Sequence, residues 1–188
     1  MIRPLFVACS ETKRGGIHPA IEKYDGPLWR TIRAADARRG TPRRFAIVAV
    51  SAQHGLVPEG QRLADYDCYL RPDGPIAVSS FNRHLTAALS EYARNCSVGV
   101  SALGLELRQQ TATYRRGNPE LIVDFVGGRL YAEALTIAGF RVRPLAPAGA
   151  GLLAMRKALR LHVEAGIATA TATEVGDSGV RRSPTSEP

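Results

Sequence analysis

The sequence has no long apolar run, because none reaches the roughly 18 residues that a membrane-spanning helix needs. The apolar stretch near the N-terminus, residues 4–8, is also shorter than the roughly 7–15 apolar residues of a secretory signal peptide. We therefore expect no membrane segment and no cleaved leader, and by default a cytoplasmic location.

Cysteine is scarce too, with Cys9, Cys68 and Cys96 far apart in the sequence. An odd number of widely spaced cysteines gives neither a disulfide framework nor a C-x-x-C metal pair. The four histidines also lack the spacing of metal ligands, so we expect no structural zinc, no other metal and no cofactor.

Lysine is scarce as well. The 25 basic residues include only three lysines, Lys13, Lys23 and Lys157, and the others are arginines. The formal net charge is +8. A basic chain favours polyanionic partners such as nucleic acid, nucleotides or phosphate. An arginine excess also arises in proteins from GC-rich genomes, so the charge alone does not decide whether a nucleic acid is bound.

The chain does have the alternating pattern of an α/β domain. Apolar stretches typical of buried strands cover residues 3–9, 43–52, 97–103, 120–128 and 140–146. Amphipathic or capped stretches predict helices over residues 26–40, 78–94, 104–119, 128–139 and 149–166. This alternation predicts a three-layer α/β fold in which a mostly parallel central sheet of about five strands carries helices on both faces.

We expect one domain, residues 1–165, followed by a tail over residues 166–188. The tail is rich in Thr, Ala, Ser and Pro and has almost no large apolar side chains. It cannot bury enough surface to offset the entropy lost on ordering, so we expect it to be disordered. The long polar stretch at residues 53–75 contains aromatic and apolar side chains, and we expect it to be an ordered loop.

Residues able to carry chemistry follow the predicted strands, and in parallel sheets sites form at the carboxyl ends of the strands. After the first strand, the Ser10 and Thr12 hydroxyls with backbone N–H groups are suited to hold an anion, and Lys13 adds charge. Cys9 has two interpretations: a nucleophile activated by Lys13 or a nearby imidazole, or a small buried residue at a strand end.

Two further segments supply groups for acid-base chemistry and for binding. Ser51, Gln53 and His54 follow the second strand, and histidine is the usual general acid or base near neutral pH. An exposed loop histidine is usually only solvated, but the position of His54 beyond a parallel strand favours a role in a site. Farther along, Asp67 is a second candidate acid or base and Tyr66 a ring able to stack on a base, unless they serve as a helix cap and a packing residue.

A glycine pair follows the fourth strand and opens a predicted helix. Gly127 and Gly128 allow a phosphate or carboxylate to approach a helix N-terminus, and Arg129 and Tyr131 lie in the same turn. A tight turn without any ligand fits the same residues. The Pro- and Gly-rich stretch at residues 143–151 either closes a wall of the pocket or simply connects two elements.

The order of six short motifs resembles that of a known family. They are C-S-E-T-K at residues 9–13, Y-D-G-P-L at 24–28, S-A-Q-H-G-L-V at 51–57, Y-D at 66–67, G-G-R-L-Y at 127–131 and P-L at 144–145 before a glycine-rich helix start. This order resembles a family of uncharacterised bacterial and phage proteins that is distantly similar to the peroxide-stress protein YaaA and to the core domain of archaeosine synthase. The resemblance implies a fold related to uracil-DNA glycosylases, work on modified bases in DNA or tRNA, and site positions at Cys9, Ser10 and Lys13.

The leading hypothesis is an enzyme that processes a nucleobase, a nucleoside or a base in nucleic acid, by cleavage or exchange of the N-glycosidic bond or by modification of the base. His54, Asp67, Cys9 and Lys13 are then the catalytic candidates. The alternatives are a DNA- or RNA-binding protein without catalysis and a stress-response protein. The leading hypothesis requires Lys13 and His54 to lie at one cleft.

Overall fold

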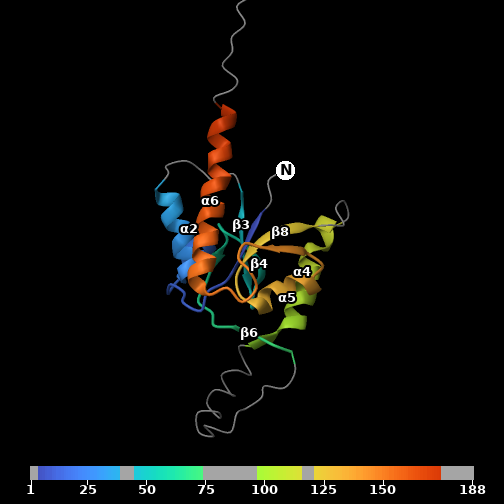
Figure 1. Ribbon diagram of the computed structural model, residues 1–188. Coiled ribbons are helices and arrows are strands. Elements are labelled where there is room, and N and C mark those ends of the chain that lie inside the picture. Colours follow the sequence, from blue (N-terminus) through green and yellow to red (C-terminus); the bar gives the residue numbers. More distant parts are fainter. Residues whose placement is uncertain (1–3, 39–44, 74–96, 116–120, 175–188) are drawn as a thin grey trace, which may run out of the picture.

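The computed structural model describes residues 4–38, 45–73, 97–115 and 121–174 of the chain (Figure 1). A five-stranded sheet has the order β4-β3-β1-β8-β9. Its strands are β1 (Leu5–Ala8), β3 (Ile47–Ser51), β4 (Gly55–Pro58), β8 (Ile122–Val126) and β9 (Arg141–Pro144). β1 pairs in parallel with β3 and β8, β8 pairs in parallel with β9, and β4 is antiparallel to β3. The prediction of a mixed α/β fold with a mostly parallel sheet of about five strands is confirmed.

Helices and short strand pairs connect these strands. The helices are α1 (Ala20–Lys23), α2 (Pro27–Ala37), α4 (Val100–Arg115), α5 (Arg129–Ile137) and α6 (Leu152–Glu174). Outside the main sheet, β2 (His18–Pro19) pairs with β5 (Arg62–Leu63), and β6 (Tyr69–Arg71) pairs with β7 (Ser97–Gly99). Pro27 occupies the first turn of α2, as expected, because its fixed φ suits that position and its missing N–H is not needed there.

The buried side chains of the described segments gather in two clusters, and β1 contributes to both. Leu5 and Val7 pack with residues of α2 and α6, whereas Phe6 and Ala8 pack with residues of α4 and α5. Successive side chains of a strand point to opposite faces, so all four residues of β1 are buried. Figure 1 shows the same grouping, with α2 beside α6 and α4 beside α5.

One charged side chain lies inside the sheet. The Asp124 carboxylate on β8 is buried and accepts hydrogen bonds from Nε and Nη2 of Arg143 on β9. His162 Nε2 on α6 lies 3.8 Å from Oδ2 of Asp124. A buried carboxylate needs such partners because it has lost its hydration, and these contacts tie β8, β9 and α6 together.

The predicted strand over residues 97–103 is wrong beyond its first three residues. Only Ser97–Gly99 is extended, and it pairs with β6 outside the main sheet. Helix α4 begins at Val100, because Val100, Leu103 and Leu107 recur at helical spacing and bury one face. The short apolar run at residues 97–103 fits a buried strand as well as the start of a helix, so the local pattern was ambiguous.

The remaining member of the main sheet is β4, within the stretch predicted as a long loop. Gly55 has φ +66°, a left-handed conformation that favours glycine, and it turns the chain back so that β4 pairs with β3. At the other end, α6 runs past residue 165, the predicted domain end, to Glu174. The helix predicted over 78–94 lies outside the described residues.

Candidate functional site

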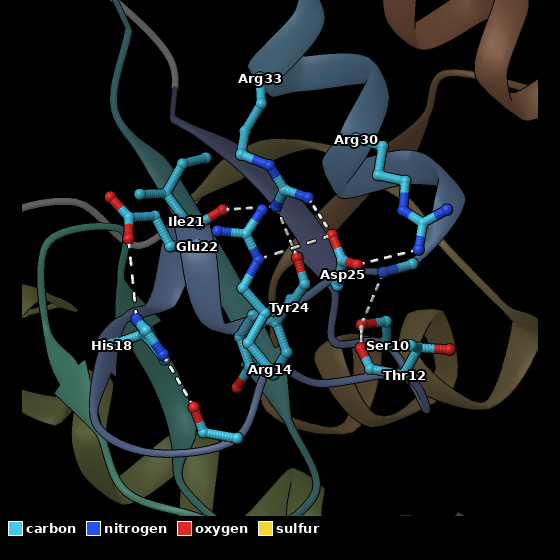
Figure 2. A network of polar contacts seen from close by, with 12 residues as sticks. Ser10, Thr12, Arg14, His18, Ile21, Glu22, Tyr24, Asp25, Arg30 and Arg33 are labelled. Carbon is cyan, nitrogen blue, oxygen red and sulfur yellow. Dashed lines mark hydrogen bonds and ion pairs between the residues drawn. The ribbon is translucent and has the colours of Figure 1, made fainter.

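The loop after β1 is fastened to the segment that precedes α2 (Figure 2). Ser10 Oγ accepts a hydrogen bond from the Gly26 N–H at 3.1 Å and donates one to the Thr12 carbonyl at 2.5 Å. That carbonyl also accepts the Asp25 N–H at 2.9 Å. A Cβ on Gly26 would lie 2.5 Å from Ser10 Cβ, so glycine alone permits this contact. Ser10 and Thr12 therefore fix the shape of the loop.

Three guanidinium groups surround the Asp25 carboxylate next to this loop. Arg30 Nη2 donates to Asp25 at 2.8 Å, Arg33 donates to the other oxygen, and Arg14 Nε lies 3.9 Å away (Figure 2). Arg33 also donates to two backbone carbonyls of the preceding turn. The hydrogen bond from Arg30, followed by the nearby positive charges, holds the pKa of Asp25 below its ordinary value.

A buried lysine holds the next loop in place. The side chain of Lys23 is 0% exposed, and its Nζ donates to the Asp65 carboxylate and to the Gly16 carbonyl. Asp65 in turn accepts the Gly16 N–H at 3.0 Å. The hydrogen bond from Lys23 is the largest of the effects that lower the pKa of Asp65. This clamp fixes the backbone immediately before Tyr66.

Tyr66 joins the loops that follow β1 and β3. Its hydroxyl lies 2.6 Å from the Tyr24 hydroxyl and 3.1 Å from Ser51 Oγ. Lys13 Nζ lies 4.8 Å from the centroid of the Tyr66 ring, and the His54 ring packs edge-on with a centroid distance of 4.6 Å. Lys13 and His54, which the leading hypothesis needed at one cleft, therefore contact the same side chain.

These contacts assign Tyr66 to the framework of the site. Burial raises the pKa of its hydroxyl to about 12, so the phenol is neutral at physiological pH. Lys13 and His54 both pack against its ring, and stacking of Tyr66 on a base stays a prediction.

Lys13 has an enclosed charge. Its side chain is only 10% exposed, and Nζ lies 4.0 Å from Oδ1 of Asp67 and 3.4 Å from the carbonyl of Glu11. Asp67 is 37% exposed, so its carboxylate is open to solvent on one side. The hydroxyl of Tyr69 donates to the other Asp67 oxygen at 3.4 Å. Lys13 and Asp67 thus form an ion pair beside the loop that follows β1.

The hairpin between β3 and β4 positions His54 by its backbone. Ser51 Oγ accepts the N–H groups of Gln53 and His54, both at 3.3 Å. From α4, Gln110 accepts the Leu56 N–H at 2.8 Å and donates to the His54 carbonyl at 3.2 Å. Burial lowers the pKa of His54, so its imidazole is neutral at pH 7. Sequence reasoning missed Gln110, whose partners are 54 and 56 residues away.

The Cys9 thiol faces a tyrosine from α5. Its Sγ lies 3.0 Å from the Tyr131 hydroxyl. Burial raises the pKa of Cys9, while the Tyr131 contact and the charge of Lys13 act in the opposite direction. The net result is a pKa above the ordinary value, so the thiol is protonated at pH 7. An activated nucleophile has a lowered pKa, so Lys13 does not activate Cys9 here.

The two glycines after β8 have different structural roles. A Cβ on Gly127 would lie 2.5 Å from Ala8 Cβ, so this glycine allows β8 to approach β1 closely. Gly128 is the N-cap residue of α5, and no side chain caps this helix end. Arg129 is exposed in the first turn. The open N–H groups and Arg129 make this helix end attractive to an anion.

Two pockets adjoin the loop after β1. The first has a volume of about 300 Å³ and is lined by Cys9, Ser10, Glu11, Lys13, Cys68, Tyr69, Leu70, Gly128, Arg129, Leu130 and Tyr131. The second has a volume of about 240 Å³ and is lined by Ala8, Cys9, Ser10, Glu11, Thr12, Gly26, Pro27, Leu28, Trp29 and Leu152. We name them the first and second pockets. Both lie where β1 ends.

The first pocket collects many of the residues chosen from the sequence. Those that line it are Cys9, Ser10, Lys13, Gly128, Arg129 and Tyr131. Asp67, Tyr66, Ser51 and His54 are joined to Lys13 directly or through the Tyr66 ring. Thr12 lines the second pocket. The chosen residues that line neither pocket are Ser51, Gln53, His54, Tyr66, Asp67 and Gly127. In the described parts of the chain, no group of three or more His, Cys, Asp or Glu side chains is placed to hold a metal ion.

The sequence reasoning missed several lining residues. They are Glu11, Cys68, Tyr69, Leu70 and Leu130. Cys68, Tyr69 and Leu70 directly follow Asp67 in the same segment, residues 63–70, but only Tyr66 and Asp67 of that segment were chosen as site residues. It also missed Tyr24, which is fully buried and binds the Tyr66 hydroxyl. Tyr24 stands in the Y-D-G-P-L motif, which was the one available signal.

Residues 5–141 match a family described as DUF6884, a family of unknown function. The match covers more than half of the chain. The chain belongs to the DUF6884 family. The DUF6884 match runs from the start of β1 to the first residue of β9, so it includes both loops that meet at Tyr66.

Comparisons with curated proteins and with solved structures found no match. The resemblance to YaaA and to archaeosine synthase therefore stays a prediction. Within the residues that the structure describes, no helix combines the length and apolarity needed to traverse a membrane.

Proposed function

We propose that the chain is an enzyme that acts on a nucleobase, in a nucleoside, a nucleotide or a nucleic acid. The reaction is cleavage or exchange of the N-glycosidic bond, or modification of the base. The observation that carries this proposal is the first pocket, in which Lys13, Arg129 and the uncapped start of α5 surround a small cavity where β1 and β8 end. We also take the fold to be three-layered, which the two core clusters on β1 support.

The first pocket suits a ligand with a flat ring and an anionic group. Its volume of about 300 Å³ is at the small end of ligand sites, which fits a nucleoside better than a larger cofactor. Lys13, Arg129 and the α5 N–H groups would hold a phosphate or another anionic group. Tyr69 is 41% exposed and lines the pocket, so we give its ring a stacking role on the base.

The acid-base work falls to Asp67 and His54. The Asp67 carboxylate is partly exposed beside Lys13, where it would stabilise positive charge that develops on a sugar as its bond to the base breaks. His54 is neutral at pH 7 and able to accept a proton. Cys9 is protonated, so we assign it to the pocket wall as a hydrogen-bonding thiol.

The test is release of free base, followed by liquid chromatography, from nucleosides, nucleotides and oligonucleotides that contain modified bases. We expect the native chain to release base from at least one of them, and Lys13→Met and Asp67→Asn to be slower by at least about tenfold, the scale of one lost charged contact. Lys157→Met is the matched control, because Lys157 is an exposed lysine on α6 outside both pockets. A well-folded sample that neither releases nor alters a base in any of these substrates, as checked by chromatography with mass detection, contradicts the proposal.

The alternative function is binding of nucleic acid without catalysis, which the net charge of +8 favours. It predicts affinity that falls steeply with salt, and Lys13→Met then lowers affinity by no more than one lost charge. Salt-independent binding of a small nucleotide supports the enzyme instead.

A further inference from the structure

The second pocket has no role in the function proposed above. It shares Cys9, Ser10 and Glu11 with the first pocket, so the two cavities lie on either side of one short segment of chain. Its far wall comes from the start of α2 and from Leu152 at the start of α6. A ligand that fills only the first pocket would leave this neighbouring cavity unused.

The second pocket has an apolar wall that is open to solvent. Pro27, Leu28 and Leu152 line it, and the Leu152 side chain is 48% exposed. Covering an exposed apolar side chain with a flat ring is favourable, because it removes apolar surface from water. The wall is therefore suited to the face of a second base or sugar.

Two exposed arginine side chains lie near the second pocket, because both contact Asp25 and the Asp25 N–H donates to the carbonyl of Thr12, which lines this pocket. The backbone N–H of Arg30 donates to the carbonyl of Gly26 at 3.0 Å, and Gly26 lines this pocket. Arg14 directly follows Lys13, which lines the first pocket, and it reaches the same carboxylate, Asp25. The side chains of Arg14 and Arg30 are 46% and 62% exposed, so both are accessible from solvent.

Asp25 does not use up these cations. One carboxylate faces three guanidinium groups, so the positive charge is in excess. Arg33 is the least exposed of the three and also donates to the backbone. Arg14 approaches Asp25 through Nε and Arg30 through Nη2, whereas each guanidinium has five N–H donors. Donors therefore remain on both exposed arginines, in the fork geometry that binds a phosphate oxygen pair.

We propose that the substrate is a single strand of nucleic acid that crosses the Cys9–Glu11 segment. The target base enters the first pocket, the adjacent nucleotide packs on the apolar wall of the second pocket, and Arg14 and Arg30 hold the phosphodiester backbone. This inference rests on the proposed function, and it narrows the substrate from any nucleobase compound to a base within a strand. A free nucleoside or mononucleotide engages one pocket only.

The test measures binding of fluorescein-labelled 12-nucleotide single strands, one DNA and one RNA, by fluorescence anisotropy at several salt concentrations. A labelled mononucleotide is measured in parallel. We expect Arg14→Gln and Arg30→Gln each to weaken strand binding by about tenfold, the scale of one charge-assisted hydrogen bond. Each should also make the slope of log affinity against log salt shallower by about 1. Mononucleotide binding should not change.

Arg160→Gln is the matched control, because Arg160 is an exposed arginine on α6 that lines neither pocket. Thermal unfolding of each variant checks that loss of binding is not loss of fold, and Asp25 keeps two arginine partners in each single variant. The inference is overturned if Arg14→Gln and Arg30→Gln bind the strands as tightly as Arg160→Gln does. It is also overturned if the mononucleotide binds as tightly as the strands.

The two proposals fail in different ways. Base release from a free nucleoside, without preference for a strand, overturns the strand inference and leaves the proposed function standing. Strand binding that depends on Arg14 and Arg30 but leads to no release or alteration of a base contradicts the proposed function and supports the binding surface. Because DNA and RNA share the phosphodiester backbone, the comparison of the two strands shows which nucleic acid binds more tightly.

Discussion

The surroundings of the Cys9 side chain determine the protonation state of its thiol. From its neighbours in sequence, Cys9 is a candidate nucleophile beside a lysine. In the folded chain its thiol is buried, and desolvation of the thiolate outweighs the help from Lys13 and Tyr131. The thiol is therefore protonated at neutral pH, and the contact with the Tyr131 hydroxyl offsets only part of the desolvation.

Replacement of Tyr131 by Phe tests this account of Cys9. The substitution keeps the ring and removes the hydroxyl whose contact lowers the pKa of Cys9. We expect alkylation of Cys9 by iodoacetamide at pH 8 to slow by about two- to tenfold, the scale of one hydrogen bond, as measured by peptide mass spectrometry. Tyr69→Phe is the control, because the Tyr69 hydroxyl contacts Asp67. Equal or faster alkylation in Tyr131→Phe would show that the contact does not stabilise the thiolate.

At the scale of elements, β1 and β8 lie close together just before the residues that line the first pocket. Leu5, Phe6 and Val7 pair in register with Asp124, Phe125 and Val126. Immediately beyond this pairing stand two glycines with different surroundings. Around Gly127 there is no room for a Cβ because Ala8 and the Phe125 ring occupy the space, whereas a Cβ on Gly128 would meet nothing within 4 Å.

The two glycines form a matched pair for stability measurements. We expect Gly127→Ala to lower the free energy of unfolding by about 1–3 kcal/mol, because the added methyl group overpacks the contact between strands. Gly128→Ala should change it by less than about 0.5 kcal/mol, since the φ of Gly128 is −73° and the site is open. Urea unfolding of both variants measures the difference. Equal losses in the two variants would show that the packing at Gly127 does not limit the approach of the strands.

At the scale of the whole molecule, the ionisable groups with lowered pKa values set how stability depends on pH. Burial lowers the pKa values of His54 and His162. Hydrogen bonds and ion pairs lower those of Asp25 and Asp65. In each case the unfolded chain takes up the proton at a higher pH than the folded chain does. Stability is therefore present above the unfolded pKa and is lost as the pH falls through the folded pKa.

The free energy of unfolding should consequently fall in two stages on acidification. The first begins below about pH 6.5, the ordinary pKa of histidine, and the second below about pH 4, that of aspartate. Urea unfolding between pH 8 and pH 3 follows both stages. Asp25→Asn should make the second stage shallower, because the residue that faces Arg30 and Arg33 then has no carboxylate that takes up a proton. Glu133→Gln, on the exposed side of α5, is the control. A second stage as steep in Asp25→Asn as in the native chain would exclude Asp25 as its source.

The amino-acid pattern determined the strands that became β1, β3, β8 and β9, the Pro27 start of α2, and the placement of polar groups after the strands. These features depend on neighbours in the chain: apolar runs, turn residues and helix starts. Tertiary structure decided the pairing of β4 with β3, the role of Tyr66 as the contact between Lys13 and His54, and the protonated state of Cys9. Each of these depends on burial and on groups distant in sequence, whose positions follow only when the whole chain packs.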